Sequence, residues 1–322
     1  MRSVRVNVPA STANLGPAFD VLALAVCLRN VVELRCTRLV RFRSEKQTRL
    51  VLRRTALTVV IRGEGGESLP LDRRCLVWKA ASRMFVRCRA APDAAALCLT
   101  NRIPLARGLG SSAAAIVGGL VATNALCGGR ISKEEIFRIA AELEGHPDNV
   151  AAALFGGLTA CIPTKEGPRA FRLPLSNAYR CVFAVPEFKL LTAHARRCVP
   201  DRMRRDDVVF SMSRAVTLAG LLARGDTREL AEMMRDRLHQ PYRARLIPGL
   251  DDVIEAALRA GALGAALSGA GSTVLALVPR KDRRVAARAG DAMVTAFERA
   301  GVRARCLVRR IDHQGARVQK VK

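Results

Sequence analysis

The stretch PLARGLGSSAAA, residues 104–115, places two glycines, two serines and a run of alanines directly after a proline. Gly108 and Gly110 allow positive φ and let a ligand approach the backbone closely. The run from Ser111 to Leu126 is rich in alanine and leucine, with apolar spacing that predicts a helix. The loop therefore ends at a helix N-terminus, where unpaired amide N–H groups and the helix dipole favour an anion.

Two interpretations of this loop stay open on its residues alone. In the first, it cradles phosphate, and the hydroxyls of Ser111 and Ser112 bond phosphate oxygens or complete a magnesium shell. In the second, it is a tight strand-to-helix turn with a serine cap. It lacks the lysine of G-x-x-x-x-G-K-[ST] and does not fit G-x-G-x-x-G, so a nucleotide loop here would belong to another class.

Length and composition indicate two domains with an aromatic-poor core. The chain has 322 residues, of which 50% are hydrophobic and 4% aromatic. Its start, MRSVRVNVPASTANL, alternates polar and apolar residues and predicts no signal peptide. The apolar stretch at 111–129 is studded with glycine and serine, so we expect a buried helix and no membrane span. The ten scattered cysteines form no CxxC pair and favour a reducing cytoplasm.

The formal net charge of +26 raises the possibility of a nucleic-acid partner. Only eight of the 54 basic residues are lysine, and the arginines are spread along the chain without the interleaved aromatics that stack bases. Residues 35–54 contain a single acid. This segment is either an anion-binding arm or a set of solvated strand edges, and we favour the strand edges.

Hydrophobic periodicity predicts an α+β protein. Ser132 with Glu135 at capping-box spacing and Gly145 at the end bound one helix clearly. Glycine and proline cluster near 156–168, so we expect domains at 1–160 and 161–322. The expected strands are 4–8, 31–42, 57–63, 95–103, 157–162, 181–186, 263–268 and 273–278. The expected helices are 76–87, 111–126, 132–145, a short one from 146, 207–224, 227–238, 249–260 and 282–300.

Four separated segments resemble the motifs of the GHMP small-molecule kinases. They are PASTANLGPAFDVLALA (9–25), PLARGLGSSAAAI (104–116), LEGHPDNVAAALFGG (143–157) and LSGAGSTVLAL (267–277). PASTANLGPAFD, LEGHPDN and RLHQPYRARLIP (237–248) are most similar to the homoserine kinase branch. The resemblance covers nearly the whole chain apart from 35–56.

This resemblance implies a fold and a reaction. The fold has two α+β domains, an N-terminal one with a left-handed βαβ crossover and a C-terminal ferredoxin-like one, with the active site in the cleft. The reaction moves the γ-phosphoryl of ATP to the hydroxyl of L-homoserine, giving O-phospho-L-homoserine for threonine biosynthesis.

The resemblance also assigns residues to ATP and Mg²⁺. Ser112 and Glu144 would hold Mg²⁺, and the catalytic set would be Glu144, Asn149 and Arg196. Glu142, two residues before Glu144, is interpreted as a solvated carboxylate. The nucleotide phosphates would be wrapped by Pro104, Leu105, Ala106, Arg107, Gly108, Leu109, Gly110, Ser111, Ser112 and Ala113.

An amino-acid substrate needs partners for an ammonium and a carboxylate. Asp20 suits the ammonium, and Arg196 and Arg243 suit the carboxylate, because a guanidinium grips it with two bonds. Asn14 and Asn149 would fit a hydroxyl or an amine. No strong general base stands out; Asp148 is a candidate, but the resemblance implies a hydroxyl that attacks with little base assistance. His146 and His239 are expected to be structural, His146 by ordering the loop of Asn149.

The third motif contains Gly269, Ala270, Gly271 and Ser272, and is expected either to support the first two motifs beneath the phosphates or to form a plain β-turn. Two positions depart from the family pattern: Ala18 replaces a glycine and Ser272 a proline. If the glycine position needs positive φ, Ala18 costs roughly 1 kcal/mol and shifts Asp20.

Two other functions remain as alternatives. One is a GHMP kinase for a different alcohol, such as a mevalonate-type substrate, which offers no ammonium to Asp20. The other is an arginine-rich nucleic-acid-binding protein that has kept the fold, which salt-sensitive binding to DNA would reveal. We expect a small-molecule substrate, no specific nucleic acid, no membrane and a homodimer.

Overall fold

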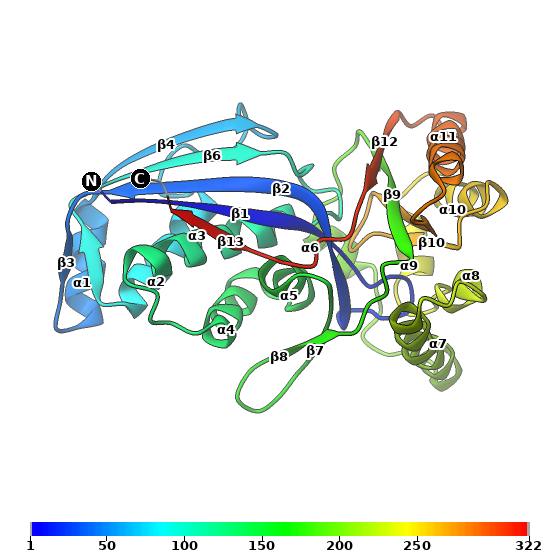
Figure 1. Cartoon of the computed structure of the whole chain (residues 1–322), viewed down its shortest axis with the longest axis horizontal. Coiled ribbons are helices and arrows are strands. Elements are labelled where there is room, and N and C mark those ends of the chain that lie inside the picture. Colours follow the sequence, from blue (N-terminus) through cyan, green and yellow to red (C-terminus); the bar gives the residue numbers. More distant parts are fainter. Residues whose placement is uncertain (1, 321–322) are drawn as a thin grey trace.

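The computed structural model describes residues 2–320, which fold into two bodies that lie end to end (Figure 1). One body is built on a seven-stranded sheet and the other on a four-stranded sheet. A two-stranded ribbon of β3 (Leu39–Arg41) and β5 (Ala90–Pro92) lies at the far end of the first body. The expected α+β class is confirmed.

The large sheet has the strand order β13-β1-β2-β6-β4, and β7 pairs with β2 while β8 pairs with β7. Alternate positions of β1 are buried in the protein core, at Val4, Val6 and Val8. This is expected for β-branched residues on the buried face of a strand. β4 and β6 pair in parallel and are joined by a crossover that contains α2 (Leu76–Arg87). The left-handed sense of this crossover stays a prediction. The strands are β1 (Arg2–Ala13), β2 (Leu22–Cys36), β4 (Ala56–Gly63), β6 (Ala94–Asn101), β7 (Leu158–Ile162), β8 (Arg169–Leu173) and β13 (Arg317–Lys320).

Four helices cover one face of this sheet (Figure 1). The central helix, α3, packs against α2, α4, α5 and the two longest strands. Because α3 is enclosed by these neighbours, it has apolar residues on nearly all of its sides. These helices are α2 (Leu76–Arg87), α3 (Ser111–Leu126), α4 (Lys133–Glu144) and α5 (Asp148–Phe155).

The second body has the antiparallel order β10-β11-β9-β12. Its elements follow one another as strand, helices, two strands, helix and strand, which together with this strand order makes a ferredoxin-like domain, as expected. The strands are β9 (Tyr179–Pro186), β10 (Gly264–Leu267), β11 (Val274–Pro279) and β12 (Ala304–Arg309). The helices are α6 (Thr192–Arg197), α7 (Arg205–Arg224), α8 (Leu230–Met233), α9 (Gln240–Ala244), α10 (Leu250–Arg259) and α11 (Arg283–Arg299).

Several expected elements match the structure closely, and α4 has both of its expected caps. The Ser132 hydroxyl accepts a hydrogen bond from the Glu135 amide, and Gly145 ends the helix in the left-handed conformation. The expected strand at 31–42 is wrong in its extent, because β2 ends at Cys36 and a separate short strand follows.

Two other expectations are wrong. The arginine-rich segment is not a set of strand edges throughout, because residues 45–54 form the helix α1 (Glu45–Arg54), with Ser44 as its cap and Leu52 buried. The helix expected over 227–238 is reduced to α8, because the Asp236 carboxylate accepts bonds from the amides of Leu238, His239 and Gln240 and so starts α9 instead.

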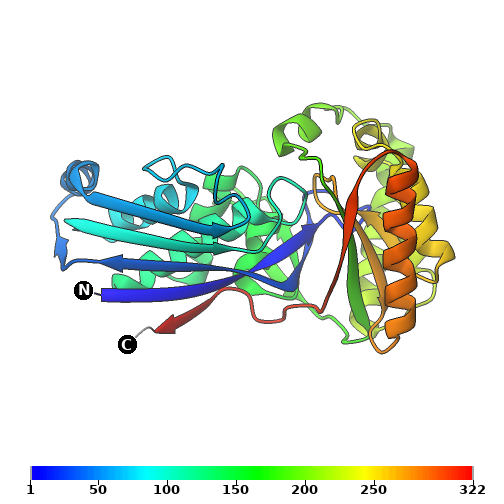
Figure 2. The same ribbon diagram turned by 90° about the horizontal axis from the view of Figure 1, so that it is seen from above.

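The chain crosses between the two bodies more than once. Strand β8 lies in the large sheet after the expected division at residue 160, and β13 returns to pair with β1 beside the N-terminus (Figure 2). We propose that the domain division falls between β8 and β9 and that the last strand belongs to the first domain. Among the helices of residues 2–320, none has both the length and the apolar character needed to cross a membrane.

Candidate active site

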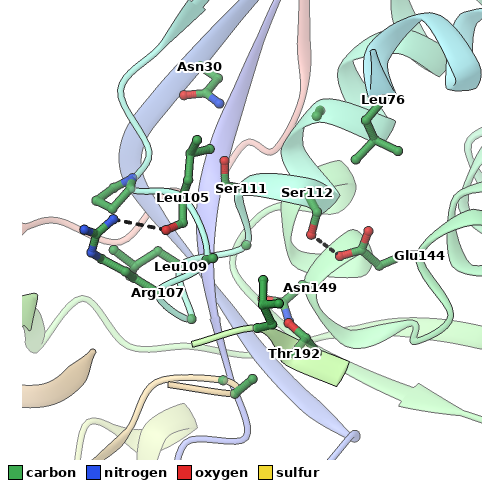
Figure 3. Close-up of a pocket in the computed structure, with 18 of the residues that line it drawn as sticks. Asn30, Leu76, Leu105, Arg107, Leu109, Ser111, Ser112, Glu144, Asn149 and Thr192 are labelled. Carbon is green, nitrogen blue, oxygen red and sulfur yellow. Dashed lines mark hydrogen bonds between the residues drawn. The ribbon is translucent and has the colours of Figure 1, made fainter. Parts of the chain in front are cut away.

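A cavity of about 390 Å³ lies between the two bodies. Its lining includes the loop before α3, the N-terminal ends of α2 and α3, the turn between α4 and α5, and α6 from the second body. Figure 3 shows the close-up, with Ser111, Ser112 and Glu144 near one another and Asn149 and Thr192 on the neighbouring segments. The cavity is large enough for a nucleotide or a drug-sized ligand.

The glycine loop ends at the N-terminus of α3, as the sequence predicts. Gly110 is the N-cap with φ of 67°, and no side chain caps the helix, so its first amides are free to bind an anion. A Cβ at Gly110 would lie 2.0 Å from the Ser11 Oγ. Glycine is therefore required twice over at this position, by the backbone conformation and by the close approach of the first motif.

The third motif lies directly beneath this loop. The Ser268 Oγ donates to the Gly108 carbonyl at 2.7 Å and lies 2.8 Å from the Thr12 Oγ1 of the first motif. A Cβ at Gly108 would lie 2.0 Å from the Ser268 carbonyl oxygen. Ser272 donates its Oγ to the Phe188 carbonyl at 3.0 Å, so the serine is held in place by its own bond. The three motifs thus form one packed unit, and a free-standing β-turn does not describe the third.

The side chain of Arg107 anchors the glycine loop. Its guanidinium Nε donates to the Pro186 carbonyl at 2.7 Å, and its Nη1 donates to the Leu105 carbonyl at 3.1 Å. A further bond runs to the Glu187 carbonyl. The side chain therefore ties the loop to the second body.

Glu144 faces the start of α3, where its carboxylate accepts a hydrogen bond from the Ser112 hydroxyl (Figure 3). Its side chain is 6% exposed. Burial raises the pKa of the Glu144 carboxyl above its usual value, opposed by the bond from Ser112 and by the charge of His146. Glu142 is instead on the surface, 3.0 Å from the Arg83 Nη2, so the structure brings Glu144 and not Glu142 to the cavity.

Ser112 and Glu144 bring a hydroxyl and a carboxylate oxygen together, and a magnesium ion prefers oxygen ligands of this kind. Within residues 2–320 no group of three or more His, Cys, Asp or Glu side chains could hold a metal alone. The pair fits an ion that takes its remaining ligands from phosphate oxygens and water, because Mg²⁺ commonly keeps several waters and binds through one or two carboxylates.

Asp148 is already engaged by its neighbours. Its Oδ1 lies 3.0 Å from the His146 Nδ1 and accepts the Asn149 amide at 2.7 Å. Burial works against a charge on His146, but the bond to Asp148 and the nearby carboxylates outweigh it, so the pKa of His146 is raised. His146 thus orders the loop of Asn149, whose Oδ1 accepts from the Ser11 Oγ at 2.9 Å.

The opposite end of the cavity gathers the residues predicted to bind an amino acid. Asp20 and Arg196 form a bidentate ion pair, with Nη1–Oδ2 at 2.9 Å and Nη2–Oδ1 at 2.6 Å. Burial opposes the charge of Arg196, but Asp20 more than compensates, and the pKa of Arg196 is raised. Asn14 supports Asp20: its Oδ1 accepts the Asp20 amide at 3.1 Å, while its Nδ2 donates to the Gly269 carbonyl at 3.0 Å.

Arg243 is 1% exposed, yet it lines the cavity. Its Nε donates to the Ala195 carbonyl at 3.1 Å, and its Nη1 donates to the Gly269 carbonyl at 3.0 Å. Burial and the neighbouring charge of Arg196 lower the pKa of Arg243. A buried cation bonded to neutral groups favours an anionic ligand.

Ala18 does not strain the first motif. It is absent from the left-handed residues of the described chain, whereas Asn14, Leu15, Gly16 and Asp20 all have positive φ. The expected penalty of an alanine in the left-handed region therefore does not arise. Asp20, two residues after Ala18, still forms its ion pair with Arg196.

The apolar end of the cavity was not predicted from the sequence. Asn30 helps shape it by accepting the amides of Arg102 and Ile103 at 2.7 and 3.0 Å. The apolar residues that line this end come from two strands, a loop and a helix, so no local sequence pattern unites them. They are Ile61, Leu69, Pro70, Leu76, Val77 and Leu99.

Two protein-family models match this chain. Residues 76–157 match the family model of the GHMP kinase N-terminal domain, and residues 218–299 match that of the GHMP kinase C-terminal domain. A mevalonate kinase of L. major, 15% identical with a TM-score of 0.66, shares the fold. The chain belongs to the GHMP kinases, which are ATP-dependent.

Relatives of higher sequence identity show to which family of GHMP kinases the chain belongs. A homoserine kinase of Moorella thermoacetica is 40% identical over 306 residues, 95% of this chain and 96% of its own. One of Desulfitobacterium hafniense is 38% identical over 315 residues, 98% of this chain and 99% of its own. The crystal structure of homoserine kinase from Cytophaga hutchinsonii superimposes with a TM-score of 0.85 at 29% identity, covering 99% of this chain and 98% of that one. Within the GHMP kinases, the chain belongs to the homoserine kinase family, which confirms the resemblance of its motifs.

Proposed function

We propose that the protein transfers the γ-phosphoryl group of ATP to the side-chain hydroxyl of L-homoserine, giving O-phospho-L-homoserine and ADP in threonine biosynthesis. The observation that carries this proposal is Arg243, a buried cation that pairs with no carboxylate within residues 2–320 and lies beside the pair of Asp20 and Arg196. Together these groups match the carboxylate and the ammonium of a free amino acid. A substrate without an ammonium would leave Asp20 unused.

The cavity orders the reactants along its length. The apolar residues beside α2 take the adenosine, the glycine loop and the N-terminus of α3 take the phosphates, and the second body presents the amino acid. Phosphoryl transfer depends mostly on positioning and charge neutralisation, which this arrangement supplies without a lysine in the loop.

Ser112 and Glu144 would hold Mg²⁺ on the phosphates, where the ion neutralises charge that develops as the phosphoryl group moves. Asp148 is committed to His146 and to the Asn149 amide, which supports a reaction in which the hydroxyl attacks with little base assistance. Asn149 and Arg196 would then align the hydroxyl and the carboxylate.

The test is ADP release by purified protein with Mg²⁺ and ATP and a panel of L-homoserine, L-serine, L-threonine and mevalonate. Homoserine is expected to give the highest kcat/KM. Preferred turnover of mevalonate would instead indicate a GHMP kinase that acts on a different alcohol.

We expect the enzyme to be cytoplasmic. We also expect its binding to DNA to be weak, without sequence preference and steeply salt-dependent.

An apolar stripe on α7 supports the expected homodimer. Val209, Met212 and Val216 are 50%, 57% and 72% exposed and share one face of the helix. We propose that two copies pack there. Val216→Glu is expected to turn a dimer into a monomer in sedimentation experiments, and an unchanged mass would rule out this face.

A further inference from the structure

His239 connects the first motif to the buried arginine of the substrate end. It is 0% exposed and precedes α9, and its ring stacks on Phe19 with centroids 5.1 Å apart. Its Nε2 lies 2.8 Å from the Gly16 carbonyl oxygen, and its Nδ1 lies 3.1 Å from the Arg243 Nη1. The imidazole therefore contacts both bodies of the protein at once.

Only one form of the ring satisfies both contacts. A guanidinium is a donor without acceptor capacity, so the His239 Nδ1 must be unprotonated to accept from Arg243. A carbonyl oxygen is only an acceptor, so the Nε2 must carry the hydrogen that is donated to Gly16. The ring is thus a neutral imidazole with its proton on Nε2.

Because His239 is a neutral acceptor, it does not neutralise the charge of Arg243. The other acceptors of this guanidinium are the carbonyls of Ala195 and Gly269, which are also uncharged. A carboxylate in place of His239 would fix the guanidinium equally well, but it would neutralise the charge that an incoming anion needs. The imidazole orients the guanidinium and leaves its charge available.

We propose that His239 is a positioning residue that aims Arg243 at the carboxylate of the amino-acid substrate, acting as a neutral acceptor in its Nε2–H form. This inference rests on the proposed function. It extends that function by assigning a role in substrate affinity to a histidine that does not line the cavity.

The charges around the ring give the proposal a pH dependence. The facing groups are Asp236 before α9, Asp20 in the first motif, Arg243 on α9 and, beyond it, Arg196 on α6. Burial and Arg243 lower the pKa of His239, against the opposite effect of Asp236 and Asp20. A proton on Nδ1 would face the N–H of Arg243 and displace it, so acid is expected to weaken the binding of homoserine.

The experiment compares His239→Asn with His239→Gln. The asparagine amide oxygen can stand near the Nδ1 position and accept from Arg243, whereas the glutamine amide reaches toward Gly16 and leaves Arg243 without this acceptor. We expect His239→Gln to raise the KM for L-homoserine roughly 10- to 100-fold, the size of a lost hydrogen bond to a charged group. His239→Asn should stay within a few fold of the wild type, and the KM for ATP should be unchanged in both.

The pH profile of the unmodified protein is the second measurement. The KM for homoserine should stay level from pH 8 to about 6.5 and rise only below it, because burial lowers the pKa of His239 from its ordinary value. The KM for ATP should change less, and His239→Asn should lose this rise. Equal KM values for homoserine in the two variants, or a parallel rise in both KM values, would overturn the proposal. If the variants do not fold, a wild-type KM for homoserine that fails to rise below about pH 6.5 overturns it. Absence of homoserine turnover in the wild type would instead refute the proposed function.

Discussion

Asp20 and Arg196 reach across the cleft from different bodies and satisfy each other with two parallel hydrogen bonds. Asp20 belongs to the loop after β1, and Arg196 lies on α6. Both side chains are about one-third exposed, at 35% and 34%. In our account the zwitterionic substrate replaces this internal pair, presenting its ammonium to Asp20 and its carboxylate to Arg196 and Arg243.

Asp20→Asn removes the negative charge expected to face the ammonium. The KM for L-homoserine should rise about 10- to 100-fold, because hydrogen bonds to charged groups contribute about 1.5–3 kcal/mol. The KM for ATP should stay within twofold in steady-state kinetics. Asp226→Asn, which breaks the exposed pair with Arg228, is the matched control and should change neither constant. Equal effects of Asp20→Asn on both constants would argue against a role in substrate recognition.

Glu144→Gln and Glu142→Gln separate the two carboxylates of α4. Glu144→Gln should lower kcat/KM at least 100-fold, with partial recovery at high Mg²⁺, because the carboxylate is expected to hold the ion. Glu142→Gln disturbs a surface pair with Arg83 and should leave activity unchanged. Activity measured against Mg²⁺ concentration checks both. A larger loss in Glu142→Gln would reverse the assignment.

The same Glu144→Gln variant should be more stable than the wild type at neutral pH. Since burial raises the pKa of Glu144, the folded state binds this proton more readily than the unfolded state, and ionisation costs stability as pH rises above the ordinary carboxyl value. Glutamine has no such cost. Melting curves should show a Tm advantage that is larger at pH 8 than at pH 4. An advantage that shrinks with rising pH would contradict the role of burial.

Gly110→Ala tests the close packing of the phosphate loop. Gly110 and Gly129 have nearly the same φ, 67° and 69°, but a Cβ at Gly129 meets nothing within 4 Å. Both alanine variants carry the left-handed strain of roughly 1 kcal/mol. Only Gly110→Ala adds the clash with Ser11, so it alone should weaken ATP binding, by tenfold or more, in calorimetric titrations. Equal ATP affinity in the two variants would disprove the tight seating of the loop.

The sequence predicted the parts of the site that lie in continuous motifs. The glycine loop, the start of α3 at Ser111 and both caps of α4 follow from local patterns, and the structure places them as expected. Glu144 was preferred over Glu142 by motif resemblance alone, and the contact with Ser112 now gives that choice a physical basis.

Other features depend on tertiary contacts that no local pattern encodes. The helix α1 was missed because its many arginines concealed the amphipathic spacing that buries Leu52. The pair of Asp20 with Arg196 joins residues far apart in the chain, so each was assigned to the substrate without the other. His239 was expected to be only structural, since its bond to Arg243 depends on the conformation of α9.

The most direct measurement is identification of the product by phosphorus NMR and mass spectrometry after incubation with Mg²⁺, ATP and L-homoserine. We expect the wild type to give O-phospho-L-homoserine and ADP in equal amounts. The Arg243→Ala and Glu144→Ala variants should give little product. A folded wild-type protein that binds ATP and forms no phosphohomoserine would contradict the proposed homoserine kinase activity. An Arg243→Ala variant with undiminished turnover would contradict the proposed substrate site.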